Sequence, residues 1–169
     1  MKKILQTAMI GFLVIVVACN GSKTDDSTET DTTAVTTETS TPAISNVMIK
    51  SLPMGPDQEV PPNNSPARGT ADVTYNKDTK MLTYTLNWSG LTASPTMAHI
   101  HGTAARGANS GVKHDLTNVL KKETAGSFTD SVKIDASDIK EDSLLSGFYY
   151  FNIHTPANPG GEIRGQIEF

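Results

Sequence analysis

The sequence predicts an all-β domain, an antiparallel Greek-key β-sandwich with one short helix, preceded by a signal peptide and a disordered tether. Two observations favour this fold class. Apolar and polar residues alternate with a period of two along most of residues 46–169. Clusters of proline and glycine interrupt the alternation and divide the segment into about seven or eight short strands with long connections. A closed β-barrel is the alternative arrangement of the same strands.

Residues 1–18 have the parts of a lipoprotein signal peptide. MKK is basic, AMIGFLVIVVA is apolar but too short to span a bilayer comfortably, and VVAC resembles a bacterial lipobox, in which the cysteine becomes acylated. Cys19 is the only cysteine in the chain and stands where a lipobox requires it. We therefore expect lipidation of Cys19, palmitate included, and anchoring in a membrane. An ordinary secretory signal cleaved after Ala18 is the alternative.

Residues 19–45 are predicted to be the lipidated cysteine followed by a disordered tether. From Asn20 to Ser45, 13 of the 26 residues are Ser or Thr, five are acidic and none is aromatic. Such a composition buries too little apolar surface to offset the entropy of ordering. SKTDD directly after Cys19 is similar to export signals of surface lipoproteins, so we expect the cell envelope, with the outer membrane or the cell surface as the location.

The charge of the mature chain excludes one class of partner. Without Lys2 and Lys3 of the signal peptide, 12 basic and 18 acidic residues remain, a net charge of −6. This balance argues against nucleic acid or anionic lipid as the main partner.

Residues 46–169 are expected to form one domain around one core, because they hold nine of the ten aromatic residues. ARGTADVTYN and MLTYTLNWSG alternate strictly, and NKDTK between them is a turn, so these two strands form a hairpin. DASDIKEDSLLSG predicts the short helix, capped by Asp135 or Ser137 and stopped at Gly147. The other expected strands are Val47–Leu52, Met97–Gly102, Gly111–Leu116, Ser127–Ile134, Phe148–Thr155 and Glu162–Phe169.

Alternation places two of the four histidines on one strand face. In MAHIHG the alanine and the isoleucine point to one side, and His99 and His101 point to the other. In GVKHDL, His114 alternates with a valine and a leucine and is expected to be a partly buried packing residue.

The last two strands are expected to pair, because TPANPGG is short enough for a hairpin loop. Asn152 and His154 lie on the polar face of the first strand. Pairing then places His154 near Glu162 or Arg164 on the second. The sequence does not determine whether the MAHIHG strand is also a neighbour.

Two imidazoles on one strand face, with a third from a nearby strand, would form a partial ligand shell for Cu or Zn. The candidate ligands are His99, His101 and His154. In the alternative interpretation, these histidines only form hydrogen bonds within a polar sheet face that includes Asn152, Glu162 and Arg164. No cofactor is certain on these residues alone.

Several segments together resemble the CHRD domain, named for chordin. They are LPMGPDQEVPP, ARGTADVTYN, MLTYTLNWSGL, AHIHG and SGFYYFNIHTPANPGGEIRGQI, and they run in family order from Leu52 to Ile167. The sequence departs from the family at ANSGVKHDL, where a glycine-proline pair and aliphatic residues are usual. The resemblance implies a β-sandwich in a secreted or anchored bacterial protein, but it gives no reason to expect chordin's growth-factor ligands.

A second similarity concerns the histidines. AHIHG followed by a late histidine and a late arginine is reminiscent of Cu/Zn superoxide dismutase, a Greek-key sandwich with an H-x-H copper motif. Four histidines are too few for the two metals of that enzyme, and a cysteine pair is missing. This counts against a dismutase more than against a single-metal site.

The expected function is therefore a non-enzymatic, membrane-anchored binding or interaction module for a protein or glycan ligand. No nucleophile elbow, phosphate loop, CxxC or HExxH motif occurs in the chain. A Cu- or Zn-binding protein of the periplasm or the cell surface is the second candidate.

Overall fold

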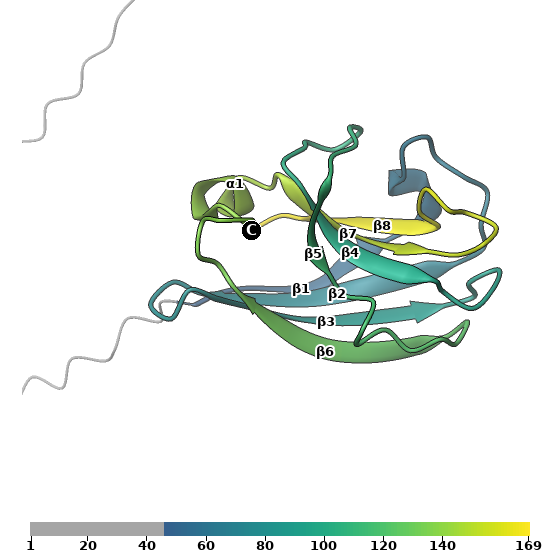
Figure 1. Cartoon of the computed structure of the whole chain (residues 1–169), viewed down its shortest axis with the longest axis horizontal. Coiled ribbons are helices and arrows are strands. Elements are labelled where there is room, and N and C mark those ends of the chain that lie inside the picture. The colour runs from purple at the N-terminus through teal and green to yellow at the C-terminus, as the bar shows by residue number, and fades with distance from the viewer. Residues whose placement is uncertain (1–45) are drawn as a thin grey trace, which may run out of the picture. The chain divides into compact units, whose positions relative to one another are not determined.

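The computed structural model describes residues 46–169, which form a sandwich of two four-stranded antiparallel sheets (Figure 1). This confirms the all-β sandwich, and the described strands do not close into a barrel. The predicted signal peptide, Cys19 and the tether lie outside the described residues. No helix within residues 46–169 has the length and apolar character needed to cross a membrane.

The first sheet has the strand order β1-β2-β3-β6. Its strands are β1 (Asn46–Met54), β2 (Arg68–Asn76), β3 (Met81–Ser89) and β6 (Gly126–Lys133). The predicted hairpin is present between β2 and β3. The Asn76 side-chain oxygen accepts hydrogen bonds from the backbone N–H groups of Asp78 and Thr79, and Lys80 adopts a φ of 57° to complete the turn.

The second sheet has the strand order β5-β4-β7-β8. Its strands are β4 (Met97–Gly102), β5 (Val112–Asp115), β7 (Tyr149–His154) and β8 (Ile163–Ile167). The expected pairing of the last two strands is confirmed. β4 and β7 are also neighbours, and β3 and β6 are neighbours in the other sheet, so the chain crosses between the sheets in the manner of a Greek key. The crossover brings together β4 and β7, the strands that carry the three candidate ligands.

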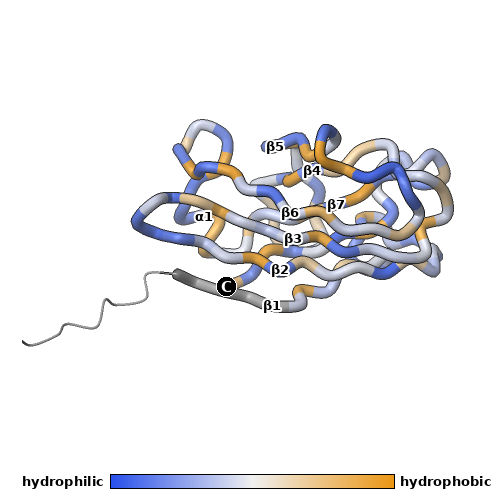
Figure 2. The backbone as a smooth tube through the Cα atoms, turned by 90° about the horizontal axis from the view of Figure 1, so that it is seen from below, coloured by the Kyte–Doolittle hydropathy of each residue, from blue (hydrophilic) through white to orange (hydrophobic). Residues whose placement is uncertain are grey.

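Inward-facing residues of both sheets fill the space between them. Figure 2 shows apolar residues recurring among hydrophilic ones along β2 and β3, and burial alternates residue by residue along much of both strands. Tyr84 of β3 packs its ring 5.1 Å from that of Phe151 on β7, which joins the two layers. Other core residues with essentially no exposure are Leu82, Leu86, Ala98, Ile100, Ile153, Ile163 and Ile167.

Trp88→Ala is expected to cost about 3–5 kcal/mol of the free energy of unfolding, the usual range for removing a core tryptophan. Trp88 is 4% exposed, stacks edge-on against Phe128 and donates from its indole nitrogen to the carbonyl oxygen of Glu123 at 2.9 Å. Urea denaturation followed by circular dichroism gives the free energy. A cooperative transition at the wild-type midpoint would contradict the placement of this ring in the core.

The helix is present but shorter than predicted, and its predicted cap is wrong. α1 spans Glu141–Leu145, with Lys140 as the N-cap residue and no side-chain cap. The Asp135 carboxylate instead accepts hydrogen bonds from the backbone and hydroxyl of Ser137, so this pair forms a turn before the helix. Gly147, with a φ of 77°, follows the helix as expected.

Candidate metal centre

The outer face of the second sheet carries the predicted histidines. Ala98 and Ile100 of β4 enter the core, so His99 and His101 point away from it, as the alternation predicts. His99 lies opposite Asn152 in the β4–β7 register. His154, on the same face of β7, is thereby brought beside the β4 pair.

This outer face is covered by loops rather than open to water. The exposed fractions are 8% for His99, 9% for His101 and 6% for His154. One covering loop contributes Ser110, whose backbone N–H donates to the Tyr150 hydroxyl at 3.1 Å. The histidines therefore form a buried polar cluster.

The three imidazoles converge on one point. One ring nitrogen from each of His99, His101 and His154 lies within 4.8 Å of the other two. His99 Nδ1 and His154 Nε2 are 3.0 Å apart. Two nitrogens bound tetrahedrally to one zinc ion at about 2.05 Å are separated by about 3.3 Å, so this pair needs little movement to share an ion.

Hydrogen bonds at the far side of two rings fix their tautomers. His101 Nδ1–H donates to the carbonyl oxygen of Ser110 at 2.9 Å, and His154 Nδ1–H donates to that of Pro159 at 3.0 Å. The Nε2 atom of each neutral ring then carries a lone pair directed into the cluster. Backbone acceptors of this kind orient the histidine ligands of metal sites.

One of these lone pairs has no partner. His101 Nε2 is buried and, within residues 46–169, accepts no hydrogen bond of good geometry, although the Asn152 side chain lies close enough to oppose the lowering of the His101 pKa by burial. A buried polar atom without a partner costs about 1–3 kcal/mol. A metal ion at the centre of the cluster would satisfy it, so the donor set fits such an ion.

Burial keeps the cluster neutral. It lowers the pKa of His154 to about 4 and also lowers the pKa values of His99 and His101, because charged imidazolium is poorly solvated there. Neutral imidazole is the form that binds metals. At the outer end of the site, His99 Nε2 is 3.9 Å from a carboxylate oxygen of Asp115.

The model of the CHRD domain family matches residues 51–167 of this chain, a stretch that includes all three histidines. The chain belongs to the CHRD domain family. No curated protein and no solved structure matches the chain. The match confirms the resemblance seen in the sequence, and a CHRD domain suggests a binding or interaction module.

Arg164, which the sequence placed on the polar face near the histidines, lies on β8 of the CHRD domain, beside the β7 strand that carries His154. The Arg164 guanidinium is 3.4 Å above the centre of the Tyr150 ring, and His101 stacks on the same ring with centroids 5.0 Å apart. Because β4 and β8 flank β7 on opposite sides, the Tyr150 ring lies between the imidazole and the guanidinium. The ring separates the two groups, but after burial the charge of Arg164 still contributes to the lowered pKa of His101.

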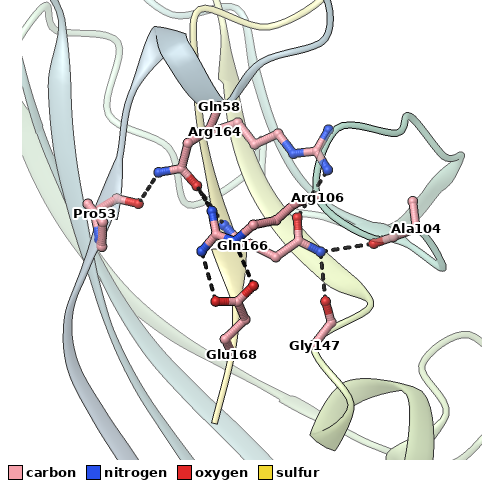
Figure 3. Close-up of polar contacts among 8 residues, drawn as sticks. All are labelled: Pro53, Gln58, Ala104, Arg106, Gly147, Arg164, Gln166 and Glu168. Carbon is pink, nitrogen blue, oxygen red and sulfur yellow. Dashed lines mark hydrogen bonds and ion pairs between the residues drawn. The ribbon is translucent and has the colours of Figure 1, made fainter.

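Neutral groups hold Arg164 in place. It donates to Gln166 Oε1 at 3.0 Å and weakly to Asn109 Oδ1 at 3.4 Å, and the ion pairs found among residues 46–169 do not include it. Figure 3 shows Gln166 in turn donating to the carbonyl oxygens of Ala104 and Gly147. This network ties the covering loop to β8.

Sequence reasoning missed a buried carboxyl group of the CHRD domain, Glu59. Burial raises its pKa to about 7, against the opposing attraction of Arg164. Glu59 Oε1 and Asn152 Oδ1 are both buried without a hydrogen-bond partner within residues 46–169. Glu59 follows the short 3-10 helix η1 (Pro56–Gln58), outside any alternating segment, so no periodic signal could have placed it.

Glu162, expected on the polar face near the histidines, has a different environment. It precedes β8 and is fully buried. Its carboxylate accepts hydrogen bonds from the hydroxyls of Ser65, Thr92 and Thr155 and from the backbone N–H of Thr92. Within residues 46–169 these donors include no histidine, so loops rather than the cluster occupy the acceptor sites of Glu162.

Proposed function

We propose that the protein is a lipid-anchored, non-enzymatic binding protein of the cell envelope whose CHRD domain holds a Cu or Zn ion. The observation that supports the metal is the unpartnered, buried Nε2 atom of His101, which faces ring nitrogens of His99 and His154 within 4.8 Å. These residues would hold the ion through neutral nitrogens. In this proposal the protein binds the ion and does not use it for catalysis.

The competing interpretation is a polar face of hydrogen-bonded histidines without metal. It accounts for the His99–His154 contact of 3.0 Å but less well for His101, whose inner nitrogen has Asn152 nearby but no hydrogen bond of good geometry in the described residues. An ion explains both features, because it uses each converging lone pair. The backbone acceptors behind His101 and His154 also suit rings that serve as metal ligands.

The experiment that tests the metal is a titration of the untagged full-length protein, first stripped by chelator. Zn²⁺ and copper should each bind with one ion per chain. At a free metal concentration of 100 times the dissociation constant, the folded state gains about 2.7 kcal/mol, which is visible as a rise in melting temperature. A melting temperature indifferent to both ions would contradict the proposal.

Cys19→Ser is expected to abolish acylation and release the protein from the membrane fraction, or to leave the precursor uncleaved. VVAC and the acidic, Ser/Thr-rich segment after Cys19 support the anchor. Fractionation of cells expressing the two proteins, with metabolic labelling by a palmitate analogue, measures both effects. Membrane retention of an unlabelled, processed variant would instead favour an ordinary secretory signal and another attachment.

A further inference from the structure

We propose that the ion bound by the CHRD domain is copper in its +1 state and that Met97 supplies its fourth ligand. This inference rests on the proposed metal site and names the ion and a ligand that the histidine pattern does not contain.

The strand register places Met97 at the histidine cluster. Met97 precedes His99 by two residues on β4 and therefore lies on the same outer face. In the antiparallel pairing of β4 with β7, its direct partner is His154. The Cβ atoms of such partners lie about 4.5–5.5 Å apart, which is within reach of a flexible thioether side chain.

The exposure of Met97 indicates that packing does not explain it. It is 39% exposed, whereas each histidine of the cluster is at most 9% exposed, and it is absent from the hydrophobic core formed by the described residues. An apolar side chain thus stands at the open end of an otherwise polar face. From that position its sulfur can close the site from the solvent side.

The ligand set available to the ion is neutral and partly soft. Within residues 46–169 the histidines converge without any carboxylate or thiolate among them, and Asp115 lies at the far nitrogen of His99. Three imidazoles and a thioether leave the charge of the ion uncompensated in a buried site. A monovalent ion costs less there than a divalent one, because desolvation cost rises steeply with charge. Thioether sulfur is among the soft ligands that bind Cu(I), and methionine is not among the usual ligands of Zn²⁺.

The test compares Met97→Leu with wild type for two ions. Leucine keeps the size and apolar character of this half-exposed side chain, so the fold should persist. Anaerobic competition against a colorimetric Cu(I) chelator should show Cu(I) affinity falling at least tenfold in the variant, while Zn²⁺ affinity stays unchanged. X-ray absorption of the Cu(I)-loaded protein should show a copper–sulfur distance in wild type only.

Met81→Leu is the matched control, because Met81 lies at a strand end in the opposite sheet, and it should alter neither affinity. If wild type binds neither ion, the proposed metal site itself is wrong. If both ions bind and Met97→Leu changes neither affinity, or lowers both equally, the site stands and the assignment of Met97 and Cu(I) is overturned.

Discussion

Replacing His99 and His101 together by alanine is expected to abolish metal binding. A structural zinc site with a full ligand set gains about 10–16 kcal/mol, or roughly 3 kcal/mol per ligand, so losing two ligands should weaken binding on the order of 10⁴-fold. Of the three histidines only His154 remains, and although it keeps its hydrogen bond to Pro159, it cannot hold an ion without the other two. Isothermal titration with Zn²⁺ and competition with a Cu(I) chelator measure the loss.

His114→Ala is the matched control for this variant. His114 belongs to β5 of the same sheet and is partly buried, as the sequence predicts, but it lies outside the converging group. The His114→Ala protein should bind metal with the affinity of wild type. Equal losses in both variants would indicate general unfolding of the sheet, and unchanged binding in the double variant would remove the site.

Glu162→Ala is expected to lower the free energy of unfolding by about 4 kcal/mol, as much as the loss of the Trp88 ring. Truncation leaves the backbone N–H of Thr92 and the hydroxyls of Ser65 and Thr155 without their acceptor; Thr155 is buried, and the hydrogen bonds from Ser65 and Thr92 are partly buried. A buried donor without its acceptor costs about 1–3 kcal/mol, so the three together account for a loss of about 4 kcal/mol. Urea denaturation at pH 7 gives the difference in free energy of unfolding.

Glu168→Ala is the control for Glu162. The Glu168 carboxylate pairs with Arg106, but both side chains are nearly half exposed, so its loss should cost less than about 1 kcal/mol. A similar small cost for Glu162→Ala would show that the loops around it are held by other contacts.

The contribution of Glu162 also has a definite pH dependence. Burial alone would raise the pKa of Glu162, but hydrogen bonds from Ser65, Thr155 and Thr92 hold it below its ordinary value of 4.5. The unfolded chain therefore binds this proton more readily than the folded one. The stability from Glu162 is present above pH 4.5 and is lost as the pH falls through the lowered folded-state pKa, so the gap between wild type and Glu162→Ala should narrow there.

Alternation was sufficient to place side chains on sheet faces but not to place strands beside one another. It assigned His99 and His101 to one face, whereas the pairing of the last two strands was predicted from the short loop between them. The adjacency of β4 and β7 depends on a crossover between sheets, and no local pattern encodes it. The hydrogen-bond partners of Glu162 could not be predicted, because Ser65, Thr92 and Thr155 lie on connections that no strand period governs.

The position of the covering loops could not be predicted from sequence patterns either. The segments that hold Glu59 and Ser110 have no period, so their closure over the outer face could not be predicted. By burying the histidines, this closure lowers their pKa values and keeps the imidazoles neutral to a lower pH. Proton competition with a bound metal should therefore begin below the ordinary histidine range near pH 6.5.

The close approach of His99 on β4 and His154 on β7 has a further consequence for the unfolding of the domain. The only cysteine of the chain is Cys19, so residues 46–169 contain no disulfide to limit their unfolding. An ion held by His99 and His154 would act as a reversible cross-link around a loop of about 55 residues, a constraint worth about 4 kcal/mol by loop entropy. Metal loading would then slow unfolding and protect the domain from proteases, and a chelator would return it to the rapidly cleaved form.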